Sequence, residues 1–197
     1  MKKQLVATCS HDNTIRIWNY HTKTLEICEV FLDEPMSLAF HPSGYHLVVG
    51  FIDRVRIMNV YSHNIRAFSE INIKACKEIK FSNGGHLFAC ANNSPDTNEI
   101  KIYRFYSGDC PQEYIFKHNA RVKTIQWMED DNGFISVSMD GSILQWRLNT
   151  DSLALIGDKR GSFSNPEFKI DFKGGVKVTD VAIRADVKNT VIAITED

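Results

Sequence analysis

The sequence predicts an all-β fold built from a repeated unit of short strands, and three observations support this. Apolar or alternating runs of about four to seven residues are separated by turn sequences such as Pro-Ser-Gly, Asn-Gly-Gly and Asp-Gly. No stretch keeps a helical spacing of apolar residues over about ten residues. Two sequence markers recur along the chain at a shared spacing, which indicates an internal repeat.

The first marker is a short strand that ends near a large side chain. It reads IRIWN at 15–19, VRIMN at 55–59, IKIYR at 100–104 and ILQWR at 143–147. The large side chains are Trp18, Met58, Tyr103 and Trp146, at intervals of 40, 45 and 43 residues.

The second marker is a strand that runs into a turn, and it precedes the first marker within each unit. Its strands end at Phe40, Phe81, Trp127 and Ile183. A four-stranded unit that recurs every ~40 to 45 residues is typical of a β-propeller blade. The predicted architecture is therefore an all-β propeller.

The two markers divide the chain into about four and a half blades, whereas closed propellers of this kind usually have about seven or eight. The predicted units are a part blade (1–33), three blades (34–73, 74–117 and 118–158) and an insertion with a further part blade (159–197). We expect an incomplete propeller, because a ring opened at both ends exposes strand edges. A closed four-bladed ring is the alternative.

Two segments are longer than the repeat requires. Residues 151–180 contain either an extra strand pair or a protruding loop, and NNSPDTN at 92–98 reads as a swollen turn. Loops on a rigid scaffold are frequent sites of binding, so both are candidates for contact with a partner. The alternative is that they are variable surface loops with no partner.

The segments SHDNTIRIW (10–18) and SMDGSILQW (138–146) resemble the end of a WD repeat. The resemblance implies a structural polar network in the fourth unit. The Trp146 indole would donate to Ser136, the Ser136 hydroxyl would meet His118, and the other ring nitrogen of His118 would meet Asp140. Such a network ties strands together and performs no reaction.

The first unit keeps part of the same pattern, in Thr8, Asp12 and Trp18. Asp12 follows Ser10 and His11, but three consecutive residues cannot converge on one point as a catalytic triad requires. The second and third units have Phe31 and Asn72 at the histidine position, so apolar packing must hold them.

Composition excludes several classes of function. The 197 residues carry 23 basic and 24 acidic side chains, a net charge of −1, which gives no electrostatic footprint for nucleic acid. The five cysteines are odd in number and form no CxxC pair, so we expect reduced thiols rather than disulfides or a zinc site. No apolar run reaches the ~18 residues of a membrane span, and no signal peptide is evident.

No pattern of catalytic, cofactor-binding or metal-binding residues is present. The seven histidines show no HxH or HExxH spacing, and the glycine pairs do not match a phosphate-binding loop. We therefore expect no enzyme, no cofactor, no metal and no small-molecule substrate. The recurring cations Arg16, Arg56 and Lys101 are expected to pair with carboxylates rather than to form a basic column.

A closer resemblance lies in EPMSLAFHPSGYHLVVGFIDRVRIMNV (34–60) and IKACKEIKFSNGGHLFACAN (73–92), together with the first unit. These segments are similar to the WD-repeat region of the cilia- and flagella-associated protein 57 family. The resemblance implies a non-enzymatic scaffold in the cytoplasm and cytoskeleton, at the ciliary axoneme. By this resemblance the scaffold protein has propellers followed by coiled coil, and it connects inner dynein arms and regulatory complexes to doublet microtubules. The alternative is a substrate-adaptor propeller of a ubiquitin ligase or signalling complex, and partner-binding residues are not predicted.

Overall fold

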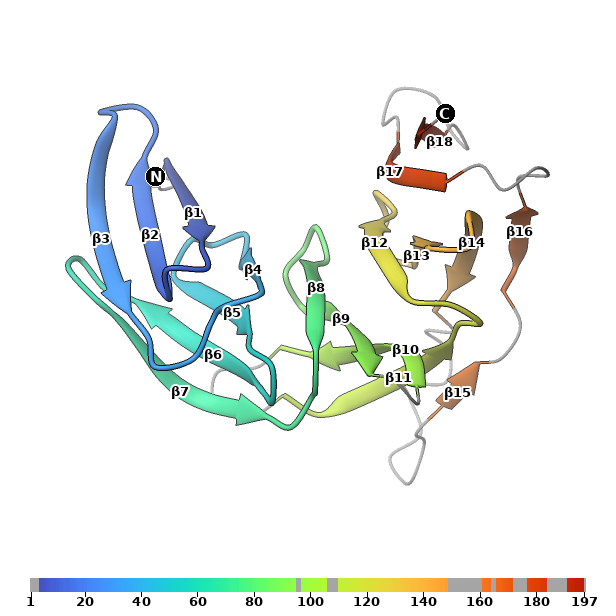
Figure 1. The fold of residues 1–197 in the computed structure, drawn as a ribbon, viewed down its shortest axis with the longest axis horizontal. Helices are drawn as coiled ribbons and strands as arrows, with labels where there is room; N and C mark the ends of the chain where they lie inside the picture. Colours follow the sequence, from blue (N-terminus) through green and yellow to red (C-terminus); the bar gives the residue numbers. More distant parts are fainter. Residues whose placement is uncertain are drawn as a thin grey trace.

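The computed structural model describes residues 4–94, 97–105, 110–148, 161–163, 166–171, 177–183 and 191–196, and its regular elements there are all β-strands. These strands form five sheets that follow one another in an open arc (Figure 1). Within those ranges no helix has the length and apolar character to cross a membrane. The predicted all-β, partial propeller is confirmed.

Each sheet takes its strands from consecutive parts of the chain, except that one strand of the third sheet, Gly161–Phe163, lies in sequence between two strands of the fourth. The first sheet contains β1 (Leu5–Cys9), β2 (Thr14–Asn19) and β3 (Thr24–Val30). The second contains β4 (Ser37–Phe40), β5 (His46–Gly50), β6 (Val55–Val60) and β7 (Ile65–Ile71).

The third sheet contains β8 (Cys76–Phe81), β9 (Leu87–Ser94), β10 (Thr97–Arg104), β11 (Gln112–Lys117) and, at its outer edge, β15 (Gly161–Phe163). The fourth contains β12 (Val122–Trp127), β13 (Gly133–Ser138), β14 (Ser142–Arg147) and β16 (Phe168–Asp171). The fifth contains β17 (Lys177–Ile183) and β18 (Val191–Glu196). The first and fifth sheets share no described strand, so the arc is not a closed four-bladed ring.

The four anchor side chains occupy equivalent places in the sheets. Trp18 pairs with Val6, Met58 with Leu47, Tyr103 with Phe88 and Trp146 with Phe134, so each anchor lies opposite a residue of the strand that precedes its own. The spacing of the first marker therefore reflects a true structural repeat.

The hydrophobic core lies between the sheets, in one layer for each adjacent pair. The largest layer, between the third and fourth sheets, contains Phe116, Trp127, Phe134 and Trp146. Each fully buried large apolar side chain contributes about 1.5–3 kcal/mol. Both faces of an inner sheet must therefore be apolar, which explains the nearly continuous apolar runs such as LVVG in β5.

Two predicted loops are partly strands in the structure. Residues 92–98 extend β9 and β10, which remain paired as far as Ser94 and Thr97, so only residues 95 and 96 lie between them. The swollen-turn prediction is wrong there, because backbone pairing continues through the polar asparagines. Of the predicted insertion at 151–180, residues 151–160, 164–165 and 172–176 lie outside the described part of the chain.

The insertion supplies two strands to two different sheets. β16 is the outer strand of the fourth sheet, paired antiparallel to β14, so the unit predicted at 118–158 ends too early. β15 pairs in parallel with β11 at the outer edge of the third sheet. The insertion thus falls between the third and fourth strands of one unit and also covers the outer edge of the preceding one.

Candidate functional site

The fourth sheet contains a buried chain of hydrogen bonds from Trp146 to His118. The indole Nε1 of Trp146 donates to Ser136 Oγ at 2.8 Å, and Ser136 Oγ lies 2.9 Å from Nε2 of His118. Trp146 is 1% exposed and Ser136 is completely buried. Since water cannot replace these hydrogen bonds, each one contributes more to the stability of the fold than the same bond would at the surface.

Asp140 does not complete this chain as expected. Its Oδ1 instead accepts from Ser138 Oγ at 2.6 Å and from the backbone N–H and hydroxyl of Ser142 at 3.0 and 2.7 Å. His118 Nδ1 is buried and has no hydrogen-bond partner among the described residues. The predicted His118–Asp140 contact is therefore wrong, because the aspartate is satisfied locally, inside its own turn.

The surroundings of His118 determine its charge. Burial lowers its pKa to about 4, although the nearby carboxylate of Asp140 acts in the opposite direction. Burial raises the pKa of Asp140, but hydrogen bonds from Ser138 and Ser142 outweigh it and hold that pKa below its usual value. At neutral pH His118 is thus an uncharged side chain inside the sheet, which suits a structural role.

The first sheet repeats the same arrangement in solvent. Trp18 Nε1 donates to Thr8 Oγ1 at 3.3 Å, but Trp18 is 37% exposed. Asp12 closes the turn between β1 and β2 by accepting from the Thr14 N–H at 3.1 Å and from Arg16 at 2.7 Å. Hydrogen bonds from Thr14 and Arg16 lower the pKa of Asp12 to about 2.

The second and third sheets replace the network by apolar packing. Met58 is 1% exposed, and Tyr103 stacks on Phe88 with ring centroids 5.4 Å apart.

A polar contact that the sequence did not suggest links the third and fourth sheets. The Asn93 amide donates to the carbonyl of Val122 and accepts its N–H, both at 2.9 Å, in the manner of a backbone pair.

The turns between first and second strands also connect neighbouring sheets. Asp131 accepts the N–H groups of Asn83 at 2.7 Å and of Gly84 at 2.6 Å from the adjacent sheet. His41 accepts the Ser43 N–H at Nδ1, so the proton of the neutral ring is on Nε2 and is donated to the Gly85 carbonyl at 3.1 Å. These contacts place successive turns side by side along one edge of the arc.

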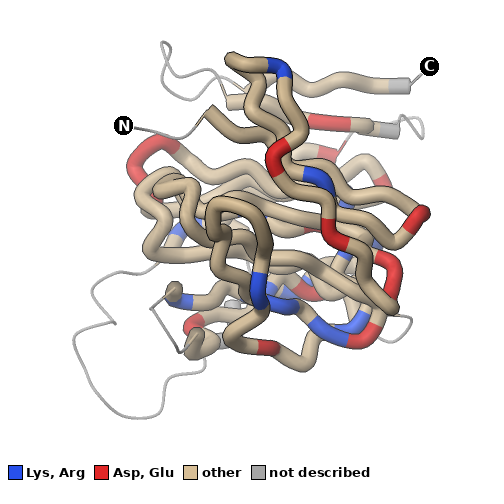
Figure 2. The backbone as a smooth tube through the Cα atoms, turned by 90° about the vertical axis from the view of Figure 1, so that its left-hand side faces the viewer, with Lys and Arg blue, Asp and Glu red and all other residues tan. Residues whose placement is uncertain are grey.

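The three recurring cations lie beside carboxylates. Arg16 pairs with Asp12 at 2.7 Å, and Lys101 lies 3.9 Å from Glu99. Arg56 contacts Glu70 at 2.9 Å in a group that also contains Asp33, Asp53 and Arg54. Figure 2, seen from the side of the first sheets, shows both signs of charge interleaved.

The remaining reactive side chains do not converge on a common point. No group of three or more His, Cys, Asp or Glu side chains in the described ranges could hold a metal ion. The five cysteines, all within the described residues, carry thiols and form no disulfide, and three of them, Cys76, Cys90 and Cys110, are buried in the layer between the second and third sheets. Burial raises the pKa of the Cys90 thiol, so this thiol stays protonated and unreactive.

Two segments of the chain match a known family of repeats. The model for the WD domain, G-beta repeat, matches residues 2–19 and 109–147. The chain is a WD-repeat protein. The matched segments contain both tryptophan anchors of the WD repeats, in the first and fourth sheets.

Relatives of this WD-repeat protein include two proteins named for cilia and flagella. It is 44% identical over 149 residues to cilia- and flagella-associated protein 57 A of Tetrahymena thermophila and 39% identical over 151 residues to mouse cilia- and flagella-associated protein 57. Each match covers 76% of this chain but only 11% and 12% of the relatives. Human echinoderm microtubule-associated protein-like 2 is 24% identical over 143 residues, 71% of this chain and 22% of that protein.

Proposed function

We propose that this WD-repeat chain is part of a non-enzymatic scaffold of the ciliary axoneme, which links inner dynein arms and regulatory complexes to doublet microtubules. The observation that carries the proposal is the 44% and 39% identity to two cilia- and flagella-associated proteins over three quarters of the chain. The weaker likeness to a microtubule-associated protein supports a cytoskeletal location.

The geometry suits a scaffold that contacts several neighbours. Four layers of buried apolar side chains and the contacts between turns hold the sheets in fixed relative positions. The turns and outer strands then present separate surfaces along one rigid arc (Figure 1). Several weak contacts made at once provide an affinity that no single loop needs to supply.

The test is to follow the protein through extraction of isolated cilia. Detergent removes the membrane and the soluble matrix, and high salt then removes part of the dynein. The tryptic peptide AFSEINIK, residues 67–74, identifies the chain by quantitative mass spectrometry. We expect it to remain with the detergent-extracted axoneme, as tubulin does, and to be depleted from the soluble matrix.

A second measurement tests the dynein connection. Disruption of the gene is expected to reduce inner-arm dynein subunits in purified axonemes and to leave outer-arm subunits unchanged. Release of the protein with the soluble fraction would overturn the axonemal proposal. Its recovery there with ubiquitin-ligase subunits would support the adaptor alternative.

A further inference from the structure

The first strands of the third and fourth sheets share an irregularity on the concave side of the arc. β8 and β12 are the terminal strands of their sheets, so each is paired along one edge only (Figure 1). Pairing of β8 with β9 skips Lys77, and pairing of β12 with β13 skips Lys123. A β-bulge of this kind re-aims the side chain of the extra residue, and both lysines are exposed.

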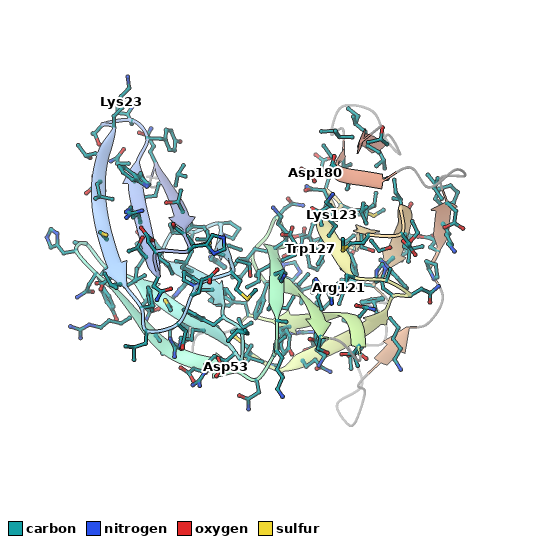
Figure 3. All side chains as sticks on the ribbon, in the orientation of Figure 1. Lys23, Asp53, Arg121, Lys123, Trp127 and Asp180 are labelled. Carbon is teal, nitrogen blue, oxygen red and sulfur yellow. The ribbon has the colours of Figure 1, made fainter. Side chains whose placement is uncertain are left out.

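Three more exposed cations accompany these two lysines. They are Lys80 in β8, Lys74 two residues before β8 and Arg121 directly before β12. Figure 3 shows Arg121 and Lys123 on the side of β12 nearest β8. We call these five side chains the inner basic strip: Lys74, Lys77, Lys80, Arg121 and Lys123.

The inner basic strip is poorly neutralised, in contrast to the ion-paired outer strands. Within the described part of the chain, its one ion pair joins Lys80 to Glu78 at 3.9 Å. Glu78 also accepts from Thr124 at 3.4 Å, and burial raises its pKa. The other carboxylate of these inner strands, Asp180 on β17, accepts the Val181 N–H at 2.8 Å. The inner strands β8, β12 and β17 thus contain two carboxylates, Glu78 and Asp180, beside the five cations of the strip, although the whole chain carries a net charge of −1.

A hollow lined by both apolar and polar side chains adjoins the strip. It lies between β4 and β8 and has a volume of about 380 Å³. Its lining includes the apolar Leu38, Pro42 and Phe81 together with Lys80, Ser82 and Asn83. A cation in a hollow that also offers apolar side chains, such as Leu38 and Phe81, fits a ligand that combines negative charge with a large apolar side chain.

We propose that the inner basic strip and the adjoining hollow bind an extended acidic segment of a partner protein, with one large apolar side chain in the hollow. The unpaired edges of β8 and β12 offer backbone groups to an extended peptide. A single-stranded nucleic acid fits less well, because it needs exposed aromatic rings on which bases stack. Trp127 on β12 is 3% exposed, and its Nε1 donates to the Lys80 carbonyl at 3.1 Å. The proposal does not depend on the ciliary function.

The test is binding of a fluorescent glutamate-rich peptide with one central leucine to the full chain, measured by fluorescence anisotropy. The variant Lys77→Glu/Lys123→Glu is compared with Lys23→Glu/Lys117→Glu, which alters the net charge equally at two exposed lysines outside the strip. We expect the first variant to lose about tenfold or more in affinity and the second to bind as the unchanged protein does. Lys77→Arg/Lys123→Arg should retain binding, and thermal melts establish that each variant is folded.

Three further probes make the result specific. Binding should weaken when serine replaces the leucine, weaken as salt is raised, and be absent for a lysine-rich peptide of the same length. Equal losses in the two charge-reversal variants would overturn the proposal, since they would show attraction by overall charge. Tighter binding of a thymidine oligonucleotide would assign the strip to nucleic acid instead. Absence of peptide binding to the unchanged chain would overturn the proposal and leave the lysines the role of keeping exposed strand edges from pairing with other chains.

Discussion

The first and fourth sheets contain the same tryptophan-to-hydroxyl hydrogen bond in two different surroundings. In the fourth sheet Trp146 and Ser136 are buried, and His118 extends the chain of contacts. In the first sheet Trp18 and Thr8 make the bond at 3.3 Å in contact with solvent. Because water competes only at the exposed site, the same motif should stabilise the protein strongly in one sheet and weakly in the other.

The largest difference is expected from removal of the indoles. Trp146→Ala leaves a cavity in the layer between the third and fourth sheets and should lower the free energy of unfolding by about 3–5 kcal/mol. Trp18→Ala removes a partly exposed ring and should cost much less. Urea unfolding of both variants measures the difference, and equal losses would contradict the comparison.

The second effect is a dependence of stability on pH. Since burial lowers the pKa of His118 to about 4, the unfolded chain takes up this proton first as the pH falls below the ordinary value of about 6.5. Stability from this residue is therefore complete above pH ~6.5 and is lost as the pH falls to ~4, by about 3 kcal/mol in all.

The control for this prediction is His118→Gln, compared with the unchanged protein in urea unfolding at a series of pH values. Burial lowers the pKa of His41 as well, and that residue contributes the same sign of slope to both proteins. The difference between the two curves isolates His118. Parallel curves would show that His118 is not held in its neutral form.

A smaller effect is expected from the hydroxyl groups. Ser136→Ala leaves Trp146 Nε1 and His118 Nε2 without their partner inside the sheet, at a cost of about 1–3 kcal/mol. Thr8→Val keeps the shape of the side chain at an exposed site and should change stability by no more than about 0.5 kcal/mol. Thermal melts of the two variants compare these costs, and a larger loss for Thr8→Val would refute the role of burial.

The smallest effect concerns the aspartates of the two equivalent turns. Asp140→Ala removes the acceptor for Ser138 and Ser142, which are themselves buried, and should cost about 1 kcal/mol. Asp12→Ala acts on an exposed turn and should cost less. Amide hydrogen exchange of Ser142 and Thr14 reports the opening of each turn, and faster exchange is expected mainly at Ser142.

Much of the fold could be predicted from the sequence, because strand and turn signals are local. The anchors Trp18, Met58, Tyr103 and Trp146 follow from spacing alone and lie in equivalent registers. The local signal also misled, since the polar run 92–98 continues two strands instead of forming a loop.

The contacts between sheets could not be predicted, because they join residues far apart in the chain. Asn93 is paired with Val122 and Asp131 with Asn83, and neither pair has a sequence pattern of its own. The role of Asp140 had a signal that could have been used. The sequence Ser-Met-Asp-Gly-Ser places two hydroxyls around the carboxylate, and these local partners take the place of the distant His118.

The sequence by itself determined the period, the strands and the residue types of the polar network, since these follow from alternation, turn chemistry and recurrence. Only the tertiary structure decided which hydrogen bonds are closed to water. It also determined which sheets share the strands of the insertion, and it placed β8 beside β12, so that the exposed cations of both strands lie on neighbouring sheets. These features depend on how one sheet packs against the next, and packing is a relation between segments that no single segment encodes.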